Sequence, residues 1–383
     1  MRRNEVVVIG DVPTQRVARA TAERRPVRRQ LTADGRSHRT AQRAARVKMA
    51  PRMRELVPML AREYDRSHPS AAARKRGGQS YGASLRAAAL LYKVASGLSA
   101  DSMIDAYDTL ITNGALLLRT PPCQNTLTQW MNDPELTPIL QHFLATTASP
   151  FRATEISAII DSSKVSQMTN AHSLWVEYEG DERDGADWIK CHAVVGAQSS
   201  VVMGVMFSGT VGDSTHDINF LKPLVKYAMR TFDLKHILAD KAYLSGEVVG
   251  WLHDLGIHAV IPVKKKWDPE TKGKYLEVCQ NHVEWFVKRQ RDFHEAFRFR
   301  VKIEALFSHL KRLAAGYCWS RGRKSTVSNR NGPCTAWMNE LLCKFIYINL
   351  RMTVTREEMT GVKANYLVTD RFFPAPTEQL IAA

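Results

Sequence analysis

The chain lacks the features that mark several large classes of protein. No run of about 18 or more apolar residues occurs, so no membrane-spanning helix is expected. The apolar stretch at residues 6–10 is too short for the core of a signal peptide. The six cysteines form no Cys-x-x-Cys pair, and no Gly-x-Gly-x-x-Gly motif is present. These absences argue against membrane, disulfide-bonded, zinc-ribbon and dinucleotide-binding proteins, and they favour a cytoplasmic protein with reduced thiols.

Acidic residues are in the minority, and the excess positive charge is concentrated in one segment. The formal net charge is +16, and residues 1–54 hold 15 Lys or Arg against 4 Asp or Glu. The same segment is poor in aromatic residues, so we expect a basic, flexible arm over residues 1–54. Its natural partner is a polyanion such as DNA. The alternative is a solvated tail from an upstream start codon, with Met49 or Met53 as the true start.

Residues 55–150 have the pattern of short helices joined by tight turns. Apolar residues recur at three- and four-residue spacing in RMRELVPMLAREYDR and in SLRAAALLYKVASGL. Gly97 is predicted to end the second of these helices, and Ser99 is a candidate to cap the next. Such a pattern is typical of a helix-turn-helix DNA-binding domain, although a small helical bundle with another purpose would look similar.

Beyond residue 151 the pattern changes to alternating strands and helices. A hairpin is predicted around a turn at Gln198–Ser200, and two buried strands are predicted to end at Asp161 and Asp240. The element order predicts an α/β fold over 151–350, a mixed sheet with helices on its faces, followed by a tail over 351–383. Function in such sheets gathers at the carboxyl ends of strands, although an aspartate there is often only a turn residue.

The helix predicted over residues 295–315 places a third carboxylate at the edge of its apolar face. At about 100° per residue, Arg300, Glu304 and Lys311 fall in one narrow stripe beside the apolar arc. A surface salt bridge between Arg300 and Glu304 would explain the stripe and would contribute about a few tenths of a kcal/mol. The functional interpretation is that this carboxylate converges with the two aspartates to bind Mg²⁺, since clustered carboxylates without a cation repel one another.

A resemblance to a known family supports the functional interpretation. The spacing of Phe297, Arg300, Glu304 and Lys311 is similar to the Tyr-x2-Arg-x3-Glu-x6-Lys signature of one branch of the bacterial insertion-sequence DDE transposases. Phenylalanine replaces the signature tyrosine and removes its hydroxyl. The segments AIIDSSKVS and ILADKAYLS resemble the family's two aspartate strands, and WIKCHAVVG and GDSTHDINFLKPLV resemble the segments between them. The resemblance covers roughly 150–350 and implies an RNase H-like catalytic domain, here preceded by a small all-α domain.

The resemblance also implies roles for individual residues. It implies that the catalytic residues and metal ligands are Asp161, Asp240 and Glu304, with Mg²⁺ as the cofactor and Mn²⁺ as a substitute. It implies that the residues in contact with DNA are Arg300, Lys311, Lys241 and Tyr243. The alternative for Tyr243 is that it packs under the following helix.

These features together predict a transposase of a bacterial cytoplasm, associated with the nucleoid. It would cleave DNA at the terminal inverted repeats of an insertion sequence and transfer the 3′-hydroxyl to target DNA by two-metal-ion catalysis. It would work as a homodimer or higher oligomer on DNA. One alternative is an RNase H-fold endonuclease without strand transfer, and another is a catalytically dead, transposase-derived DNA-binding protein.

A second group of titratable residues suggests a zinc or hydrolase site. It comprises His192, Asp213, His216 and Asp217. The last three lie together at the predicted start of a helix, where capping explains them without a ligand role. His192 lies within a predicted strand and is expected to be an ordinary core residue.

Overall fold

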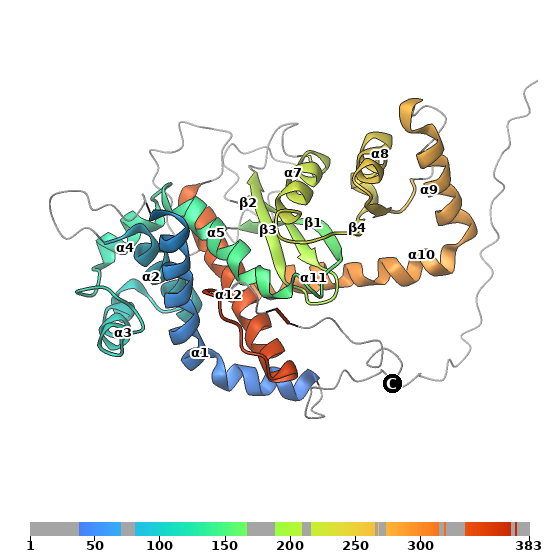
Figure 1. The fold of residues 1–383 in the computed structure, drawn as a ribbon. Helices are drawn as coiled ribbons and strands as arrows, with labels where there is room; N and C mark the ends of the chain where they lie inside the picture. Colours follow the sequence, from blue (N-terminus) through green and yellow to red (C-terminus); the bar gives the residue numbers. More distant parts are fainter. Residues whose placement is uncertain are drawn as a thin grey trace, which may run out of the picture.

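The protein is built around one mixed sheet that is covered by helices on both faces (Figure 1). The computed structural model describes residues 38–69, 81–166, 188–208, 216–264, 267, 273–313, 318, 334–368 and 372–373. None of the helices in these ranges is long and apolar enough to cross a membrane.

The sheet has five strands in the order β3-β2-β1-β4-β5. The strands are β1 (Ser157–Ser166), β2 (Trp188–Gly196), β3 (Val202–Ser208), β4 (His236–Ala239) and β5 (His258–Val260). The first three are antiparallel neighbours, whereas β4 is parallel to β1 and β5 is parallel to β4. The predicted hairpin is confirmed, since β2 and β3 are joined across the turn at residues 197–201. This arrangement confirms the α/β, RNase H-like fold expected from the sequence.

Alternation along the strands divides the core into two layers. Successive side chains point to opposite faces of a strand, so Ile159 packs on one face while Ala158 and Ile160 pack on the other. The second face is covered by α7 (Ile218–Ala228), α8 (Gly246–Asp254) and α9 (Leu276–Lys288). The first face is covered by α5 (Leu136–Ala148), α11 (Val301–Arg312) and α12 (Thr335–Thr360). Between α9 and α11 the chain runs through α10 (Gln290–Phe297) and a 3₁₀ turn, η6 (Arg298–Arg300).

The N-terminal region is helical, as its periodicity predicts. Its helices before α5 are α1 (His38–Ser67), α2 (Ala83–Ser96), α3 (Ala100–Thr112) and α4 (Gln124–Met131). Gly97 adopts a left-handed conformation with φ 68° directly after α2, which confirms it as the C-terminal cap. The side chain of Ser99 accepts a hydrogen bond from the Ser102 amide at 3.1 Å, which confirms it as the N-cap of α3.

The first helix begins well before the expected boundary at residues 54 and 55. Residues 38–54 are part of α1, so the prediction of a flexible arm is wrong for this part of the chain. The arm was expected because the segment is so basic, but its small and apolar side chains form a buried face that includes Ala41 and Ala45. A buried ion pair between Arg52 and Glu357, at 2.7 Å, links the same segment to α12. A start at Met53 would remove this ion pair.

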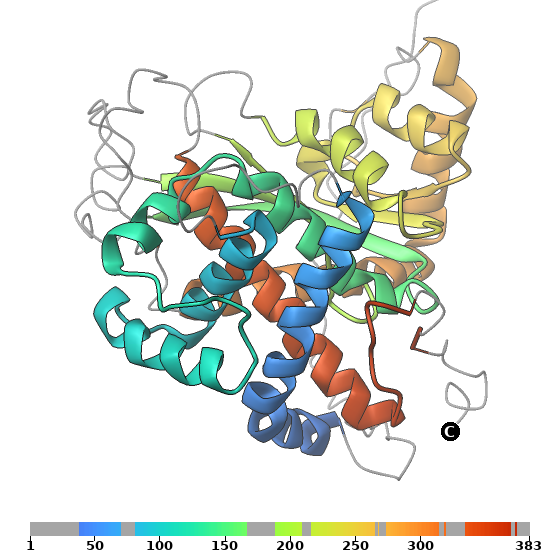
Figure 2. The ribbon, with the colours of Figure 1, turned by 60° about the vertical axis from the view of Figure 1, so that its left-hand side comes forward.

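The long helix α12 supports both the N-terminal helices and the sheet. It packs against α1, α2, α5 and β3, and Figure 2 shows it running beside α1 through the middle of the molecule. The expected domain end at residue 350 falls inside it. Its buried Asn349 bridges the layers, since its Oδ1 accepts a bond from Val202 N at 2.7 Å and its Nδ2 donates to Val202 O at 2.8 Å. The same amide also donates to Thr147 Oγ1 of α5 at 3.2 Å.

Replacing Asn349 with leucine is predicted to lower the free energy of unfolding by about 2–4 kcal/mol, because the buried N–H and C=O of Val202 would lose their partner. Denaturant unfolding monitored by circular dichroism measures the change. Asn125, exposed on α4, provides the matched control, and Asn125→Leu should change the value by less than about 0.5 kcal/mol. Equal effects from both substitutions would contradict the bridging role of Asn349.

Candidate functional site: three carboxylates around one arginine

The register of two parallel strands brings Asp161 and Asp240 together. Ile160 of β1 pairs with Ala239 of β4, so the aspartates that follow them lie side by side. Asp240 follows the last residue of β4, which confirms its predicted place at the carboxyl end of a strand. Asp161 lies in the middle of β1, and the prediction that it ends its strand is wrong, because β1 continues to Ser166 along β2. It lies at the point where the neighbour β4 ends.

Glu304 is brought to the same place by the packing of α11. The apolar face predicted for this helix is confirmed, since Ile303, Leu306 and Leu310 are buried against the sheet and α12. The segment is shorter than predicted, because α11 begins at Val301 and is preceded by the η6 turn. Phe297, which replaces the tyrosine of the signature, stacks on Phe293 with 5.6 Å between ring centroids. This stacking does not depend on the hydroxyl of the signature tyrosine.

The three carboxylates meet at the guanidinium group of Arg300. Its Nη2 lies 2.7 Å from Asp161 Oδ2 and 3.7 Å from Asp240 Oδ2. Its Nη1 lies 2.7 Å from Glu304 Oε1. The simple prediction of an Arg300–Glu304 salt bridge is therefore confirmed, but the same arginine also joins two carboxylates from the sheet. The three acidic residues predicted from separate elements converge on one cation.

The electrostatic balance at this point leaves an excess of negative charge. When all four side chains are ionised, one guanidinium faces three carboxylates, and the four side chains together carry a net charge of −2. Burial raises the pKa of Asp161, and the negative charges of Asp240 and Asp217 raise it further. The Ser162 amide, which donates to Asp161 Oδ1 at 2.9 Å, and the charge of Arg300 act in the opposite direction and lower that pKa.

The carboxylates have the right chemistry for a divalent cation. Oxygen ligands from aspartate and glutamate are those that Mg²⁺ and Mn²⁺ prefer, and two positive charges would match the deficit. In the part of the chain that the structure describes, no three His, Cys, Asp or Glu side chains are close enough together to hold a metal as they stand. Arg300 lies among the carboxylates instead. The donor set fits the cation, provided that Arg300 moves.

The predicted DNA contacts differ in their exposure. Lys241 and Lys311 are exposed, on the η4 turn (Lys241–Tyr243) and on α11 respectively. Tyr243 is only 1% exposed and packs with the core beneath α7 and α8, where burial raises the pKa of its hydroxyl. The prediction that Tyr243 contacts DNA does not fit this placement, because a backbone phosphate has no access to the buried ring. The alternative of a packing role fits it.

A fourth carboxylate lies behind Asp161, and its interactions were not anticipated. Asp217 takes the N-cap position of α7, but its side chain makes no capping bond, so the capping explanation is wrong. Its Oδ1 lies 2.8 Å from Lys190 Nζ and 3.3 Å from Nδ1 of the fully buried His192. Hydrogen bonds from His192 and Lys190 outweigh its partial burial and hold the pKa of Asp217 well below its usual range. Lys190 and His192 are two residues apart in a predicted strand and therefore lie on the same face of it. This spacing is the feature of the sequence from which a shared acidic partner could have been predicted.

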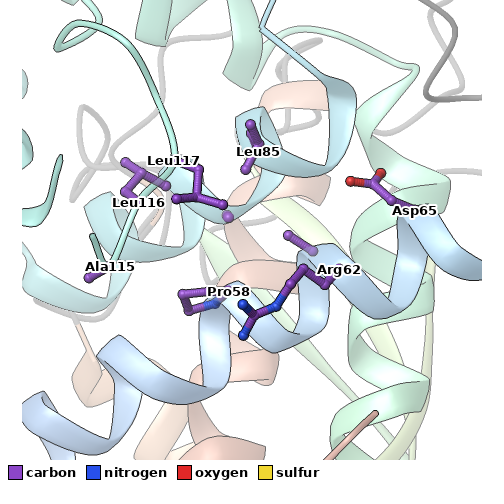
Figure 3. A pocket seen from close by; sticks show the side chains of 9 residues that line it. Pro58, Arg62, Asp65, Leu85, Ala115, Leu116 and Leu117 are labelled. Carbon is purple, nitrogen blue, oxygen red and sulfur yellow. The ribbon is translucent and has the colours of Figure 1, made fainter.

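Two other features lie outside the carboxylate cluster. Asp213, one of the four residues considered for a zinc or hydrolase site, lies outside the described residues. A small cavity of about 110 Å³ lies between α1, α2 and residues 115–117 (Figure 3). It is lined mainly by apolar side chains such as Pro58 and Leu116, with Arg62 and Asp65 beside them. The cavity shares no residue with the carboxylate cluster.

Three comparisons with known proteins give one family match, which falls on the segment that holds the three carboxylates. No curated protein matches the chain. A solved structure described as a piggyBac transposase synaptic complex with hairpin DNA shares 10% identity at a TM-score of 0.33, over 86% of this chain and 81% of that chain. The family model of the transposase DDE domain matches residues 153–330, a segment that contains Asp161, Asp240 and Glu304. Residues 153–330 of this chain are therefore similar to the DDE domain of transposases.

Proposed function

We propose that the protein cleaves DNA at the ends of an insertion sequence and transfers the freed 3′-hydroxyl to target DNA, with Mg²⁺ held by Asp161, Asp240 and Glu304. The observation that carries the proposal is the convergence of these carboxylates, from β1, β4 and α11, on one point. The DDE domain that spans them supports it. Mn²⁺, which takes the same oxygen ligands, would substitute for Mg²⁺.

The protein's own residues would bind and orient the reacting groups. When bound, Mg²⁺ supplies a Lewis acid that activates an attacking water or hydroxyl and offsets charge on the leaving oxygen. Asp161 and Asp240 are held by the paired strands, and Glu304 is held by a helix with one face buried, so the backbone positions of the three ligands are set before DNA arrives. No serine or tyrosine of the chain is needed as a nucleophile in this scheme.

Arg300 would have two successive partners. In the protein alone its guanidinium offsets the repulsion of the carboxylates. If divalent cations neutralised the carboxylates, the guanidinium would be free to contact a DNA phosphate. A planar group with paired N–H donors binds phosphate oxygens well. Lys311 lies in the same helical stripe, and Lys241 follows Asp240 directly. Both are exposed and would contact the backbone beside the scissile bond.

The remaining parts of the chain would bind and assemble on the DNA. The region 55–150 would be a helix-turn-helix-like domain that recognises the terminal inverted repeats, and the basic residues that precede it would hold the backbone. The region from residue 151 to the end of α12 at Thr360 would be the catalytic domain. Two ends of one element have to be joined to one target, so a homodimer or higher oligomer would form on DNA. The reaction would take place in the bacterial cytoplasm, at the nucleoid.

Replacing Asp240 with asparagine is predicted to reduce DNA cleavage by more than about 100-fold while DNA binding stays nearly unchanged, because the substitution removes a metal ligand and leaves the DNA-binding residues in place. The test incubates the protein with a supercoiled plasmid that carries its gene and native flanks, in Mg²⁺, in Mn²⁺ and in EDTA. Asp233, 81% exposed and away from the site, provides the control, and Asp233→Asn should cut like the wild type.

The products of the same reactions separate the alternatives. Metal-dependent cuts at the element's ends, followed by joining to new DNA, are the expected result. Cuts without joining would favour the endonuclease, and DNA that is bound but never cut would favour the catalytically dead DNA-binding protein. An Asp240→Asn protein that cuts at the wild-type rate would show that the metal ligands are assigned wrongly.

Replacing Arg300 with glutamine is predicted to tighten Mn²⁺ binding by the DNA-free protein about 5- to 100-fold, because the guanidinium and the metal compete for the same carboxylate oxygens. Free Mn²⁺ measured by electron paramagnetic resonance gives the affinity directly. Arg298→Gln, an exposed neighbour on η6, removes the same charge without touching the carboxylates and should leave the affinity close to wild type. Equal Mn²⁺ affinities for the wild type and Arg300→Gln would show that Arg300 does not compete with the metal.

A further inference from the structure

Three arginines, from α1, α11 and α12, act electrostatically on His309 in the last turn of α11, and one of them contacts its ring. Arg46 comes from α1, His309 and Arg312 come from α11, and Arg351 comes from α12; we call these four residues the cationic cluster. Both α1 and α11 pack against α12. Arg46 and Arg312 are exposed, whereas His309 and Arg351 are half-buried. The cluster includes none of the residues that surround the three carboxylates.

The closest contact in the cluster is between two groups that are both cationic when protonated. Arg351 Nη1 lies 2.5 Å from His309 Nε2. A guanidinium only donates hydrogen bonds, so the imidazole nitrogen accepts this bond and the ring is neutral. Burial, followed by the positive charges of Arg351, Arg312 and Arg46, lowers the pKa of His309 to about 4. Among the described groups that act on this ring, none is a carboxylate.

Nearby acidic side chains of α12 already have other partners. Glu357 pairs with Arg52 at 2.7 Å, and Glu358 pairs with Lys48 at 2.7 Å. The negative end of the α11 dipole would favour the cations of its own last turn, but it does not account for arginines supplied by two other helices. The cluster therefore holds positive charge that no described carboxylate offsets.

The position of the cluster relates it to the carboxylate site. At about 100° per residue, Glu304 and His309 lie at the two edges of the exposed face of α11, with Arg312 between them. A polyanion that crosses this face would reach both edges. On α1, Arg39, Arg43 and Arg46 recur at four- and three-residue spacing, so they lie on one side of that helix, and all three are exposed. The row therefore continues the positive charge of the cluster from Arg46 toward the N-terminal end of α1.

We propose that the cationic cluster binds phosphates of duplex DNA that runs across the exposed face of α11 and onto the arginine row of α1. The inference rests on the proposed function only in taking DNA as the ligand. A polyanion with regularly spaced phosphates fits a row of charges from three helices better than a single small anion does. The contacts are to the backbone, so they position the duplex and are independent of its sequence.

The test uses the exposed members of the cluster, whose replacement leaves the core intact. The double variant Arg46→Gln with Arg312→Gln is compared with a matched variant on the opposite face of the sheet, Lys226→Gln with Arg230→Gln, whose side chains are also exposed. Binding to short duplexes of two unrelated sequences is measured by fluorescence anisotropy in EDTA, across a range of salt concentrations. Thermal unfolding of each variant checks that the fold is retained.

The expected result is an affinity about tenfold weaker for the cluster variant on both duplexes, with the slope of log K against log salt reduced by about 0.9 for each phosphate that the variant no longer neutralises. The control variant should keep the wild-type slope. Equal slopes for the two variants would overturn the inference and leave the proposed function standing, since plasmid cleavage tests that separately. A wild-type protein that binds neither duplex would also overturn the inference, and plasmid cleavage would still decide the proposed function. Charge reversal by Arg312→Glu should weaken binding more than Arg312→Gln alone does, and an unchanged affinity would also count against the cluster.

Discussion

The mutual repulsion of three carboxylates is the constraint around which the sheet-containing half of the protein is organised. Asp161, Asp240 and Glu304 come from two strands and a helix, and their ionised side chains would separate if the elements were free to move. Parallel pairing of β1 and β4 holds the two aspartates, and the buried face of α11 holds the glutamate. Arg300 completes the arrangement by bonding to Asp161 and Glu304 at 2.7 Å each. Packing supplies the positions, and the guanidinium offsets the charge.

The support for α11 comes from α12, which also carries the N-terminal helices. Because α12 is buried along most of its length, it connects parts of the chain that the sequence pattern separates into domains. Asn349 bonds to β3 and α5 at once, and Glu357 bonds to Arg52 of α1. The helices expected to bind DNA and the sheet that holds the carboxylates therefore share one continuous core. Their relative placement is a property of the folded protein and does not depend on a linker.

Charge is distributed in a way that suits a reaction on a polyanion. The chain as a whole is strongly basic, with a formal net charge of +16, yet acidic residues gather at the carboxylate site. Cations such as Lys311 lie on the exposed surface around it. In the proposed function, long-range attraction would bring a phosphate backbone to the surface, and the local negative charge would select a divalent cation. Asp217, paired with Lys190 and His192, adds to this negative charge from behind Asp161.

Helix periodicity, helix caps and strand ends could be predicted from the sequence alone, because each depends on residues close together in the chain. The apolar period of α11, the left-handed cap at Gly97, the N-cap at Ser99 and the strand that ends at Asp240 all depend on neighbours a few residues away. The spacing of Arg300 and Glu304, together with the two aspartate segments, also indicated the carboxylates that the structure brings together. The helix over residues 38–54 was missed because the high charge of this segment masked a narrow apolar face.

Only the tertiary structure decided which groups meet across the chain. It placed Arg300 among all three carboxylates, buried Tyr243, and paired Asp217 with Lys190 and His192 where local capping was expected. It also brought Arg351 of α12 to His309 of α11, at 2.5 Å. Such contacts depend on strand register and on the packing of helices far apart in sequence. Periodicity specifies which face of an element is buried, but it does not specify which other element covers that face.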